Sequence, residues 1–468
     1  MNAPAQPLDL DLLAAQLTEG GKLLTAPEDL AEYGRDWTRI HEPRPVAIAL
    51  PKTTAEVQAL VRFANQHKLA LVPSGGRTGL SAGAVAANGE LVVSFERMNR
   101  ILDFSASDRL VHCQAGVVTQ QLQEFAEEQG LYYPVDFASA GSSQIGGNLG
   151  TNAGGIKVIR YGMSRDWVAG LTVVTGNGDI LDLNRDLAKN NTGYDLRHLF
   201  IGAEGTLGFI TEATMKLARK PDNLTVLVLG LADLSNTMDV LRTFQDSLDL
   251  TAYEFFSHEA MEFVLAHGDV PKPFDTAAPY YALIEFEAIS EGVLEEAMAR
   301  FEHCMDSGWI VDGVISQSET QAKNLWQLRE RISESIAPRT PYKNDLSVRV
   351  SRVPAFLREI DNVVREHYPD FEIIWFGHIG DGNLHLNILK PEDMEKGEFF
   401  ERCKAVNVWV FDIVQRHHGS VSAEHGVGMV KKDYLSYSRS AEEINMMRGI
   451  KRVFDPNGIM NPGKIFDL

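Results

Sequence analysis

Cysteine is scarce in this chain, and other features that would place the chain in a special class are absent. The three cysteines, Cys113, Cys304 and Cys403, lie far apart and form no CxxC pair, so neither a disulfide framework nor a zinc ribbon is predicted. No run of eighteen apolar residues occurs, and the first residues lack the basic and apolar regions of a secretory signal. We therefore expect reduced thiols and a cytoplasmic protein.

Positive charge is also in short supply. The 468 residues include 44 Lys and Arg against 64 Asp and Glu, which gives a formal net charge of −20. An acidic surface repels phosphate backbones and anionic lipid, so binding to nucleic acid or to a membrane surface is not expected. The length corresponds to two or three domains, and the 44% of hydrophobic residues is ordinary for a globular protein. These proportions favour an acidic multidomain enzyme.

Two glycine-rich segments, 73–79 and 141–155, stand out in the first half of the chain. Neither contains the GxGxxG motif of dinucleotide-binding folds or the GxxxxGK[ST] motif of P-loops, so NAD and simple nucleotide hydrolysis have no motif support. Glycine permits left-handed backbone and close approach, and successive N–H groups can then hold an anion. Each segment alone could be an ordinary loop, but the two together favour a backbone wrapped around a flat or phosphorylated ligand.

The apolar pattern predicts how the chain is organised. A hairpin is expected at 170–183, and the texture of the sequence changes near residue 220. After that point we expect a sheet covered by helices on one face. Its predicted strands are 225–231, 251–256, 280–287 and 309–316, and its predicted helices are 235–246, 290–306 and 318–336. A strand pair within 371–389, a helix at 398–417, a loop at 419–428 and a last helix with a Pro/Gly-rich tail follow.

A histidine-containing stretch, 376–387, joins two apolar strands through a Gly-Asp-Gly-Asn turn. The turn brings His378 and His385 onto neighbouring strands, and Asn387 shares a face with His385 because side chains alternate along a strand. A third ligand could come from the segment 422–428. Two imidazoles and a carboxylate form an open site for Zn²⁺ or a similar divalent ion. From the residues alone, both histidines could equally be core side chains.

A candidate anion site lies on the predicted helix 318–336 and in the residues after it. Arg329 and Ser333 are four residues apart and so share a helical face, and Lys343 follows after a proline-containing loop. Arginine pairs with carboxylates through two parallel N–H groups, and lysine adds a point charge. A solvated helix with surface charges is the alternative.

The glycine-rich segments, with 201–208 and 461–464, resemble the FAD-binding domain of the vanillyl-alcohol oxidase / p-cresol methylhydroxylase superfamily. Some members attach FAD through a histidine in the first segment; this chain has Arg77-Thr78 there and no histidine, so non-covalent FAD is implied. The residues that the resemblance implies for FAD binding are Pro73, Ser74, Gly75, Gly76, Arg77, Thr78, Gly79, Gly141, Ser142, Gly146, Gly147, Asn148, Thr151, Asn152, Gly154, Gly155, Glu204, Gly205, Ile210 and Asn461.

The histidine stretch and the Glu-His-Gly-Val-Gly motif resemble the metal motif of the D-2-hydroxyacid dehydrogenase branch of that superfamily. The similarity implies His378, His385 and Glu424 as metal ligands. It also implies Asn387 as a substrate contact and His425 as the substrate-binding residue that takes the hydroxyl proton.

Substrate anchors are implied as well. In the D-2-hydroxyglutarate dehydrogenase family an Arg, a Thr and a Lys at matching positions bind substrate. Arg329 and Lys343 match, while Ser333 stands in place of the threonine and keeps its hydroxyl. With Asn387, these groups exceed what one carboxylate needs beside a divalent ion, which favours a dicarboxylate substrate over D-lactate.

The implied fold class is α+β, in three parts. An FAD-binding domain of the p-cresol methylhydroxylase type is expected at 1–219, a ferredoxin-like α+β substrate domain with the metal site at 220–425, and a C-terminal helical segment, 426–468, that returns to the FAD domain.

The implied reaction is oxidation of D-2-hydroxyglutarate, or of a related acid such as D-malate, to the 2-oxo acid, with the C2 hydride passing to flavin N5. Reoxidation would need an acceptor such as an electron-transfer flavoprotein or a quinone, and a homodimer stays open. Three alternatives remain: a D-lactate or glycolate dehydrogenase of the same family, a flavin-free metallohydrolase, and a non-catalytic subunit of a glycolate-oxidase-type complex.

Overall fold

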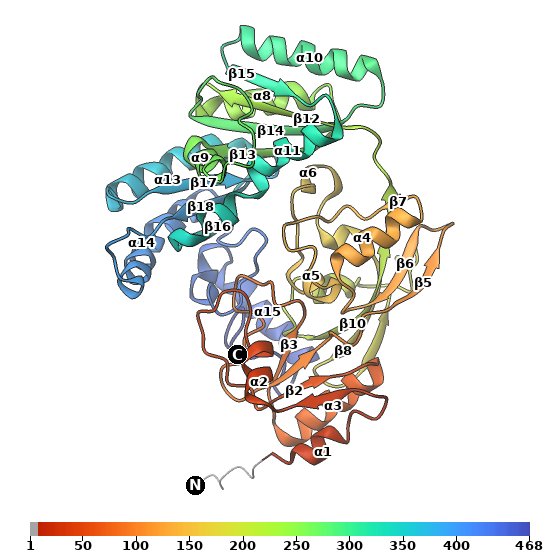
Figure 1. The fold of residues 1–468 in the computed structure, drawn as a ribbon. Helices are drawn as coiled ribbons and strands as arrows, with labels where there is room; N and C mark the ends of the chain where they lie inside the picture. Colours follow the sequence, from red (N-terminus) through yellow and green to blue (C-terminus); the bar gives the residue numbers. More distant parts are fainter. Residues whose placement is uncertain (1–7) are drawn as a thin grey trace. The chain divides into compact units, whose positions relative to one another are not determined.

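The computed structural model describes residues 8–468 and has an α+β architecture, as predicted (Figure 1). The chain divides into two compact units. The first unit comprises Met1–Ala153, Met163–Lys220 and Glu424–Leu468, and the second comprises Gly154–Gly162 and Pro221–Ala423. The boundaries expected from the sequence, 219/220 and 425/426, lie within two residues of this division, but the sequence did not place 154–162 with the second unit.

Two main sheets frame the first unit. In the four-stranded sheet, order β1-β2-β4-β3, strands β2, β4 and β3 run parallel. Its strands are β1 (Lys22–Leu24), β2 (Ala47–Leu50), β3 (Leu71–Ser74) and β4 (Leu91–Ser94). The five-stranded sheet, order β5-β6-β10-β8-β9, is antiparallel. Its strands are β5 (Ile101–Ser105), β6 (Leu110–Gln114), β8 (Val168–Thr175), β9 (Ile180–Leu183) and β10 (Gly208–Lys216).

The predicted hairpin is confirmed, because β8 pairs antiparallel with β9. A further small sheet joins β7 (Leu131–Tyr132) to β11 (Ala218–Arg219). The helices of the first unit are α1 (Leu10–Ala14), α2 (Pro27–Tyr33), α3 (Thr54–His67), α4 (Thr119–Glu128), α5 (Ile145–Thr151), α7 (Arg197–Phe200) and α15 (Ala441–Phe454), with 3₁₀ turns η1 (Ser164–Trp167) and η5 (Lys432–Tyr437).

Helix α3 shows why these elements form. The Thr53 hydroxyl accepts a hydrogen bond from the Glu56 backbone N–H at 3.2 Å, which satisfies one donor of the first turn. Val57, Leu60 and Val61 recur at helical spacing and are buried in the core that the strands of the four-stranded sheet share. Full burial of such side chains stabilises the fold by about 1.5–3 kcal/mol each.

The C-terminal segment returns to β3 in the first unit. Met460 forms a parallel bridge with Leu71, and the Asn461 N–H donates to the Leu71 carbonyl at 2.8 Å. Just before it, the buried Lys451 Nζ lies 2.8 Å from Asp455 Oδ2 and also donates to the Thr206 and Met460 carbonyls. These bonds fix the tail beside the first glycine-rich segment, which begins at the end of β3.

The second unit contains one seven-stranded antiparallel sheet of order β15-β12-β14-β13-β17-β18-β16. Its strands are β12 (Leu224–Leu231), β13 (Leu250–Ser257), β14 (Tyr280–Glu287), β15 (Ile310–Ile315), β16 (Tyr342–Ser347), β17 (Ile373–Gly377) and β18 (Asn383–Ile388). All the strands predicted after residue 220 are present, whereas β16 was not predicted.

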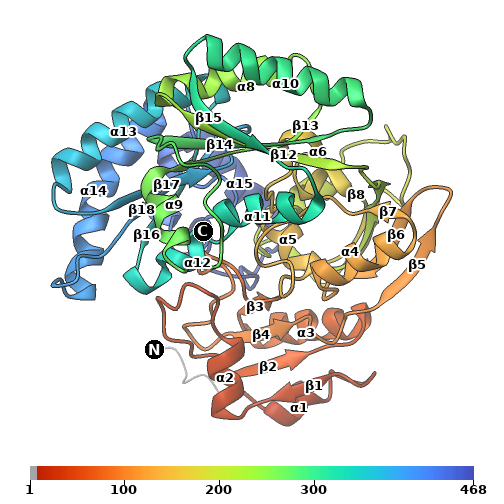
Figure 2. The ribbon, with the colours of Figure 1, turned by 45° about the horizontal axis from the view of Figure 1, so that its top comes forward.

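Helices cover both faces of this sheet, so the expectation of one covered face is wrong (Figure 2). On one face α9 and α11 share a core with Phe256 and Phe376, and on the other the Tyr253 hydroxyl donates to the Thr237 carbonyl of α8. The helices are α6 (Val158–Tyr161), α8 (Thr237–Gln245), α9 (His258–Leu265), α10 (Glu291–Asp306), α11 (Glu319–Glu330), α12 (Ile332–Ile336), α13 (Val353–His367) and α14 (Lys396–Arg416), with 3₁₀ turns η2 (Leu234–Asn236), η3 (Ala337–Arg339) and η4 (Val350–Arg352).

The single helix predicted at 318–336 is two helices. Arg331 separates α11 from α12, although its N–H still donates to the Gln327 carbonyl and its carbonyl accepts from the Ser335 N–H. The four-residue spacing of Arg329 and Ser333 therefore spans the boundary between the two helices. Within residues 8–468, no helix is both long and apolar enough to cross a membrane, and Cys113, Cys304 and Cys403 are free and buried.

Candidate functional site

The two glycine-rich segments lie against each other in the first unit. A Cβ added at Gly76 would lie 2.1 Å from the Ser142 carbonyl oxygen, so the two backbones meet where no side chain fits. By contrast, a Cβ added at Gly147 or Gly150 would meet nothing within 4 Å. Packing inside the protein therefore requires glycine at Gly76 but not at Gly147 and Gly150. The latter two leave open space along α5, as a bound ligand would need.

Three buried polar atoms beside these segments have no hydrogen-bond partner among the described residues: Ser74 Oγ, Gln144 Oε1 and Asn461 Oδ1. Ser74 ends β3, Gln144 precedes α5, and Asn461 is held in place by its amide, which donates to the Gly83 and Glu204 carbonyls. An unsatisfied buried polar atom costs about 1–3 kcal/mol. The orphaned atoms and the open glycine faces fit a polar ligand of the FAD type.

Other residues implied for FAD binding have protein partners. The Arg77 guanidinium lies 4.4 Å from the centre of the Tyr33 ring and 3.5 Å from a Glu32 carboxylate oxygen. The Asn148 amide donates to the buried Thr119 hydroxyl at 2.7 Å. The Asn152 side chain accepts from the Arg165 N–H at 3.0 Å.

Two glycines of the implied FAD set, Gly154 and Gly155, belong to the second unit, and Ile210 is a core side chain of β10. For Arg77, Asn148 and Asn152 the structure shows contacts within the protein, and their role in FAD binding stays a prediction. The role of Gly154, Gly155 and Ile210 in FAD binding stays a prediction as well.

Glu204 holds the loop that follows His425. Its two carboxylate oxygens accept from the Val427 and Gly428 N–H groups at 2.7 and 2.8 Å. Burial raises the pKa of this carboxyl to about 7, and the two backbone donors only partly offset that cost. Gly426 has a φ of +79°, and a Cβ there would lie 3.0 Å from the Glu204 carboxylate, so the loop needs glycine at this point.

Four polar side chains lie in a row across adjacent strands of the second unit. His385 on β18 is paired across the sheet with Phe376 of β17 and with Asp345 of β16. Phe376 in turn is paired with Phe256 of β13. Paired residues and residues two apart share a face of a sheet, so Glu254 and His378 lie on the same face as His385 and Asp345. We call Glu254, His378, His385 and Asp345 the polar row.

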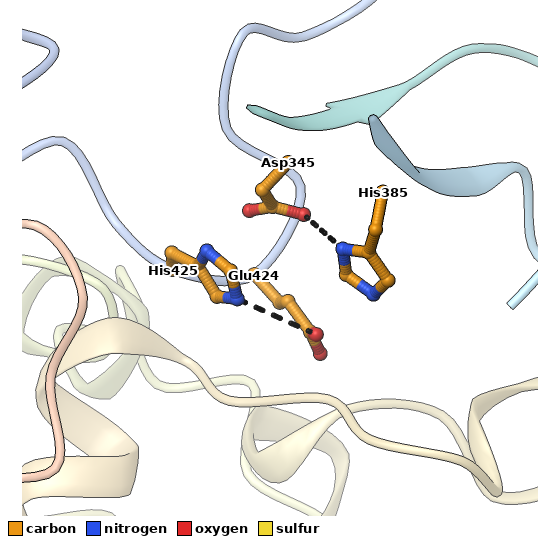
Figure 3. A group of neighbouring side chains, drawn as sticks. All are labelled: Asp345, His385, Glu424 and His425. Atoms are coloured by element: carbon orange, nitrogen blue, oxygen red, sulfur yellow. Dashed lines mark ion pairs between the residues drawn. The ribbon is translucent and has the colours of Figure 1, made fainter. Parts of the chain in front are cut away.

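Each histidine of the polar row faces a buried carboxylate. His378 Nδ1 lies 2.8 Å from Glu254 Oε1. His385 Nδ1 lies 3.8 Å from Asp345 Oδ1, and Figure 3 shows this second pair. The two imidazole rings are 5.4 Å apart, centre to centre. Glu254 and Asp345 are each 1% exposed. A carboxylate that acts on Nδ1 of a histidine favours Nε2 as the metal-binding atom of the same ring.

Glu424 and His425 follow Ala423 directly in the chain, and the segment before them is bound to β16. Ser420 forms a bridge with Ser347, and the Ala423 N–H donates to the Asp345 carbonyl at 3.3 Å. One ligand atom each from Asp345, His385, Glu424 and His425 lies within 4.8 Å of the others (Figure 3). Two imidazoles and two carboxylates at this spacing form a donor set suited to a divalent ion such as Zn²⁺.

The sequence prediction overlaps with this group without matching it. His385, Glu424 and the adjacent His425 are in the group, whereas His378 is outside it and beside His385. Asp345 was missed. Its strand, β16, lacks a clear apolar alternation, and only the pairing of Asp345 with His385 reveals the position.

The substrate anchors predicted from the sequence differ in their surroundings. Arg329 is 6% exposed, stacks 4.7 Å over the Phe376 ring and has its Nε 2.8 Å from Glu254 Oε2, so a solvated surface arginine is excluded. Ser333 is half-buried on α12, two residues after Arg331.

Lys343 and Asn387 lie opposite each other on β16 and β18. Desolvation lowers the pKa of the Lys343 amine although the side chain keeps an exposed surface. Asn387 is buried and its Oδ1 has no hydrogen-bond partner among the described residues, while its amide donates to the His385 carbonyl at 3.2 Å. A buried acceptor without a partner beside a lysine fits a site for a polar ligand.

Comparison with known proteins assigns the chain to a family. Residues 45–184 match the family described as FAD binding domain, and residues 220–465 match FAD linked oxidases, C-terminal domain. A D-2-hydroxyglutarate dehydrogenase of Stutzerimonas stutzeri (strain A1501) is 68% identical over 450 residues, 96% of this chain and 97% of that protein. The mitochondrial D-2-hydroxyglutarate dehydrogenase of Bos taurus is 37% identical over 97% of this chain and 83% of its own length.

A putative mitochondrial D-lactate dehydrogenase of Schizosaccharomyces pombe is 34% identical over 96% of this chain and 87% of its own length. Among solved structures, a p-cresol methylhydroxylase with bound substrate matches with a TM-score of 0.75 at 16% identity, covering 98% of this chain and 96% of that chain. An alkyldihydroxyacetonephosphate synthase matches with a TM-score of 0.73 at 19% identity, over 99% of this chain and 87% of that one. At these identities the structures show the fold alone, and they confirm the p-cresol methylhydroxylase type.

Proposed function

Since the chain belongs to the FAD-linked oxidase family, among the D-2-hydroxyglutarate dehydrogenases, we propose that it oxidises D-2-hydroxyglutarate, or a related D-2-hydroxy dicarboxylate, to the 2-oxo acid. Membership of this family makes it an FAD-dependent hydroxyacid dehydrogenase. The observation that carries the substrate proposal is the polar row, beside which Lys343 and Asn387 offer a cation and an unsatisfied amide oxygen.

Metal binding is the first part of the proposed chemistry. We assign a divalent ion, Zn²⁺ or another, to His378, His385 and Glu424, with Asp345 beside His385 as a second carboxylate. The donor set of imidazoles and carboxylates suits such an ion. When bound, the ion would lower the pKa of a coordinated 2-hydroxyl group, as metal ions do for bound water.

Proton removal is assigned to His425. Its Nε2 lies 3.9 Å from a Glu424 oxygen, so the imidazole is adjacent to the proposed metal ligand. We assign this imidazole as the base that accepts the proton of the substrate hydroxyl. A positioned histidine base contributes about 10²–10⁴-fold to the rate of such a step.

Substrate orientation is assigned to Arg329, Ser333, Lys343 and Asn387. Lys343 and Asn387 are paired across neighbouring strands, and Asn387 is two residues from His385 on the same face. A second carboxylate would use the cation of Lys343, whereas the methyl group of D-lactate would leave it without a partner, at about 1–3 kcal/mol. Holding C2 in one orientation can contribute up to about 7–11 kcal/mol when the geometry is ideal.

FAD is assigned to the two glycine-rich segments and to the C-terminal Asn461, held without a covalent bond because Arg77 stands where some members carry histidine. When bound, FAD supplies the redox chemistry by accepting the C2 hydride. The orphaned Ser74, Gln144 and Asn461 atoms support this placement. An electron-transfer flavoprotein or a quinone as acceptor, a homodimer and a cytoplasmic location remain proposals that rest on the resemblance and the composition.

D-lactate or glycolate oxidation is the second candidate, favoured by the D-lactate dehydrogenase name of the fission-yeast relative. The flavin-free hydrolase loses its support, because both halves of the chain match FAD-enzyme families. A non-catalytic subunit is disfavoured by the group formed by Asp345, His385, Glu424 and His425.

The test is anaerobic bleaching of the bound flavin in a stopped-flow mixer. We expect D-2-hydroxyglutarate to reduce the flavin with the highest kcat/KM, D-malate next and D-lactate least, and L-2-hydroxyglutarate to leave the flavin oxidised. If D-lactate reduces the flavin fastest, the second candidate is the better assignment. If both enantiomers of 2-hydroxyglutarate reduce the flavin equally, the site does not select the D configuration and the proposed site is refuted.

A further inference from the structure

Glu254 is a buried carboxylate that none of the sequence motifs includes. It lies in β13, is 1% exposed, and contacts two residues of the proposed site with its two oxygens. Oε1 lies 2.8 Å from His378 Nδ1, and Oε2 lies 2.8 Å from Arg329 Nε. The contact with Arg329 is a close ion pair whose alignment is not that of a hydrogen bond.

A charge in this position is expensive unless it has partners. Taking a carboxylate out of water is unfavourable even after relaxation, and removing a single member of a buried pair is strongly destabilising because it leaves the other charge uncompensated. Glu254 has a cationic partner in Arg329 and a hydrogen-bonding partner in His378. A hydrophobic side chain would fill the same place in the core of Phe256 and Phe376 without that cost, so the carboxylate needs a reason beyond packing.

We propose that Glu254 is a positioning residue that orients His378 for the divalent ion and Arg329 for the substrate carboxylate at the same time. The inference rests on the proposed function, because it assumes that His378 and Arg329 act as assigned there.

The contact with Glu254 bears on the tautomer of His378. Nδ1 lies 2.8 Å from Glu254 Oε1, a distance at which a proton on Nδ1 would complete a hydrogen bond and leave the lone pair on Nε2. Metal-binding histidines commonly donate their second N–H to a carboxylate, which fixes the ring and raises its basicity as a ligand. Asp345 lies toward Nδ1 of His385 in the same sense, at 3.8 Å. In His378, Nε2 is therefore the atom suited to a metal ion.

The contact with Glu254 also bears on the direction of the Arg329 guanidinium. Its Cζ lies over the Phe376 ring, 4.7 Å from the ring centre, and its Nε lies 2.8 Å from Glu254 Oε2. No carboxylate among the described residues pairs with its two terminal nitrogens, which form the fork that binds a carboxylate through two parallel bonds. Glu254 thus contacts the guanidinium at Nε, while the two terminal nitrogens can bind an anion.

Glu285 provides a matched control on the neighbouring strand β14. It is 3% exposed and also paired with a cation, Lys157, while its other oxygen accepts from the Trp326 indole N–H at 2.8 Å. None of these partners is assigned to metal or substrate. Glu254→Gln and Glu285→Gln each remove one buried negative charge from the same sheet, so a difference between them reports on the site and not on the loss of charge.

The experiment compares wild type, Glu254→Gln and Glu285→Gln as FAD-loaded full-length protein. Zn²⁺ affinity is measured without substrate, by competition with a chromophoric chelator, and KM and kcat are measured with D-2-hydroxyglutarate. Melting temperature and flavin content report on folding. Glu254→Gln should weaken Zn²⁺ binding by about 10–100-fold and raise KM by about tenfold, while Glu285→Gln should leave both within about twofold of wild type even if its melting temperature falls.

A second cycle separates the two halves. In an Arg329→Met background, Glu254→Gln should no longer raise KM, because no guanidinium is left to orient, yet it should still weaken Zn²⁺ binding. If Glu254→Gln does not fold, Glu254→Asp replaces it: the shorter side chain keeps the charge but cannot contact both partners, and the same losses are expected.

Folded Glu254 variants with wild-type Zn²⁺ affinity and KM would overturn the inference while leaving the proposed function intact. Losses of equal size in Glu254→Gln and Glu285→Gln would do the same, because they would reflect a general effect of charge removal. A wild-type protein that binds no divalent ion, or oxidises no D-2-hydroxy acid, would instead refute the proposed function, and the inference would fall with it.

Discussion

The buried carboxyl of Glu204 should make the stability of the first unit depend on pH in a way that one substitution removes. Its pKa is raised from the ordinary value of 4.5 to about 7, first by burial, against the lowering effect of the Val427 and Gly428 N–H groups and of Lys431 and Lys464. The unfolded chain has the ordinary carboxyl pKa, so the two states bind different numbers of protons between these values.

The sign follows from the direction in which the pKa moves. Because the folded state holds the proton more tightly, this group stabilises the fold fully below a pH of about 4.5, and the contribution is lost as the pH rises through about 7. A tenfold change in proton affinity corresponds to about 1.4 kcal/mol, so the whole contribution is about 3 kcal/mol. Between pH 6 and pH 8.5 the part that is lost is about 1–2 kcal/mol.

The measurement is urea-induced unfolding at saturating FAD, followed by flavin fluorescence so that the transition of the flavin-binding unit is read separately. Between pH 6 and pH 8.5, the free energy of unfolding of wild type should fall by about 1–2 kcal/mol more than that of Glu204→Gln, which cannot ionise. Glu56→Gln is the control: Glu56 is 1% exposed and also accepts backbone N–H groups, those of Glu19, Gly21 and Lys52. It should keep the wild-type pH dependence.

Parallel pH curves for wild type and Glu204→Gln would refute the reasoning, since they would mean that Glu204 titrates alike in both states. A flattened curve for Glu56→Gln would be equally damaging, because any buried carboxylate would then produce the effect. The result bears on the site as well: the loop that Glu204 holds directly follows Glu424 and His425.

Four further outcomes are expected from the proposed site. Denaturation should release all the flavin into the supernatant, and colour that stays with the precipitated chain would mean a covalent bond. A chelator, or His385→Ala, should abolish flavin reduction by D-2-hydroxyglutarate while flavin content and melting temperature change little; full-rate reduction by chelated enzyme would contradict the role of the ion. His425→Ala should slow reduction by about 10²–10⁴-fold in single-turnover kinetics, and a rate close to that of wild type would exclude it as the base. Lys343→Ala should lower kcat/KM for D-2-hydroxyglutarate and D-malate far more than for D-lactate, and an equal loss for all three acids would place Lys343 at the C1 carboxylate.

Much of the fold could be predicted because its signals are local. The β8–β9 hairpin has a Gly-Asn-Gly-Asp turn between apolar runs, and the strands β12 to β15 read as apolar segments bounded by turn residues. The division into α11 and α12 at Arg331 could not be predicted, since the two helices continue one another in the apolar pattern. The coverage of both faces of the sheet was also not predicted. The sequence did not reveal α9 and α13, and the order of helices along the chain does not determine which face each one covers.

Some residues of the candidate site can be recognised from short sequence motifs, whereas others are revealed only by the pairing of strands. His378, His385, Glu424 and His425 belong to short segments that a family resemblance can identify, and the turn between β17 and β18 brings the two histidines together. Glu254 precedes His378 by 124 residues, and nothing in its local sequence, Ala252-Tyr253-Glu254-Phe255, distinguishes it from a partly exposed strand residue. Only the register of β13 against β17 places it there.

Asp345 shows how a weak local signal can still be used once one strand is known. On β16, Lys343, Asp345 and Ser347 alternate with Asn344 and Leu346, so a single register assignment fixes the face of all three. A shift by one residue would turn Asp345 away from His385 and bring Asn344 or Leu346 in its place. The antiparallel pairing of β16 with β18 is therefore the step that gives His385 a carboxylate and Asn387 a lysine. A substitution that weakens this pairing should impair metal and substrate binding together, even if it touches neither ligand.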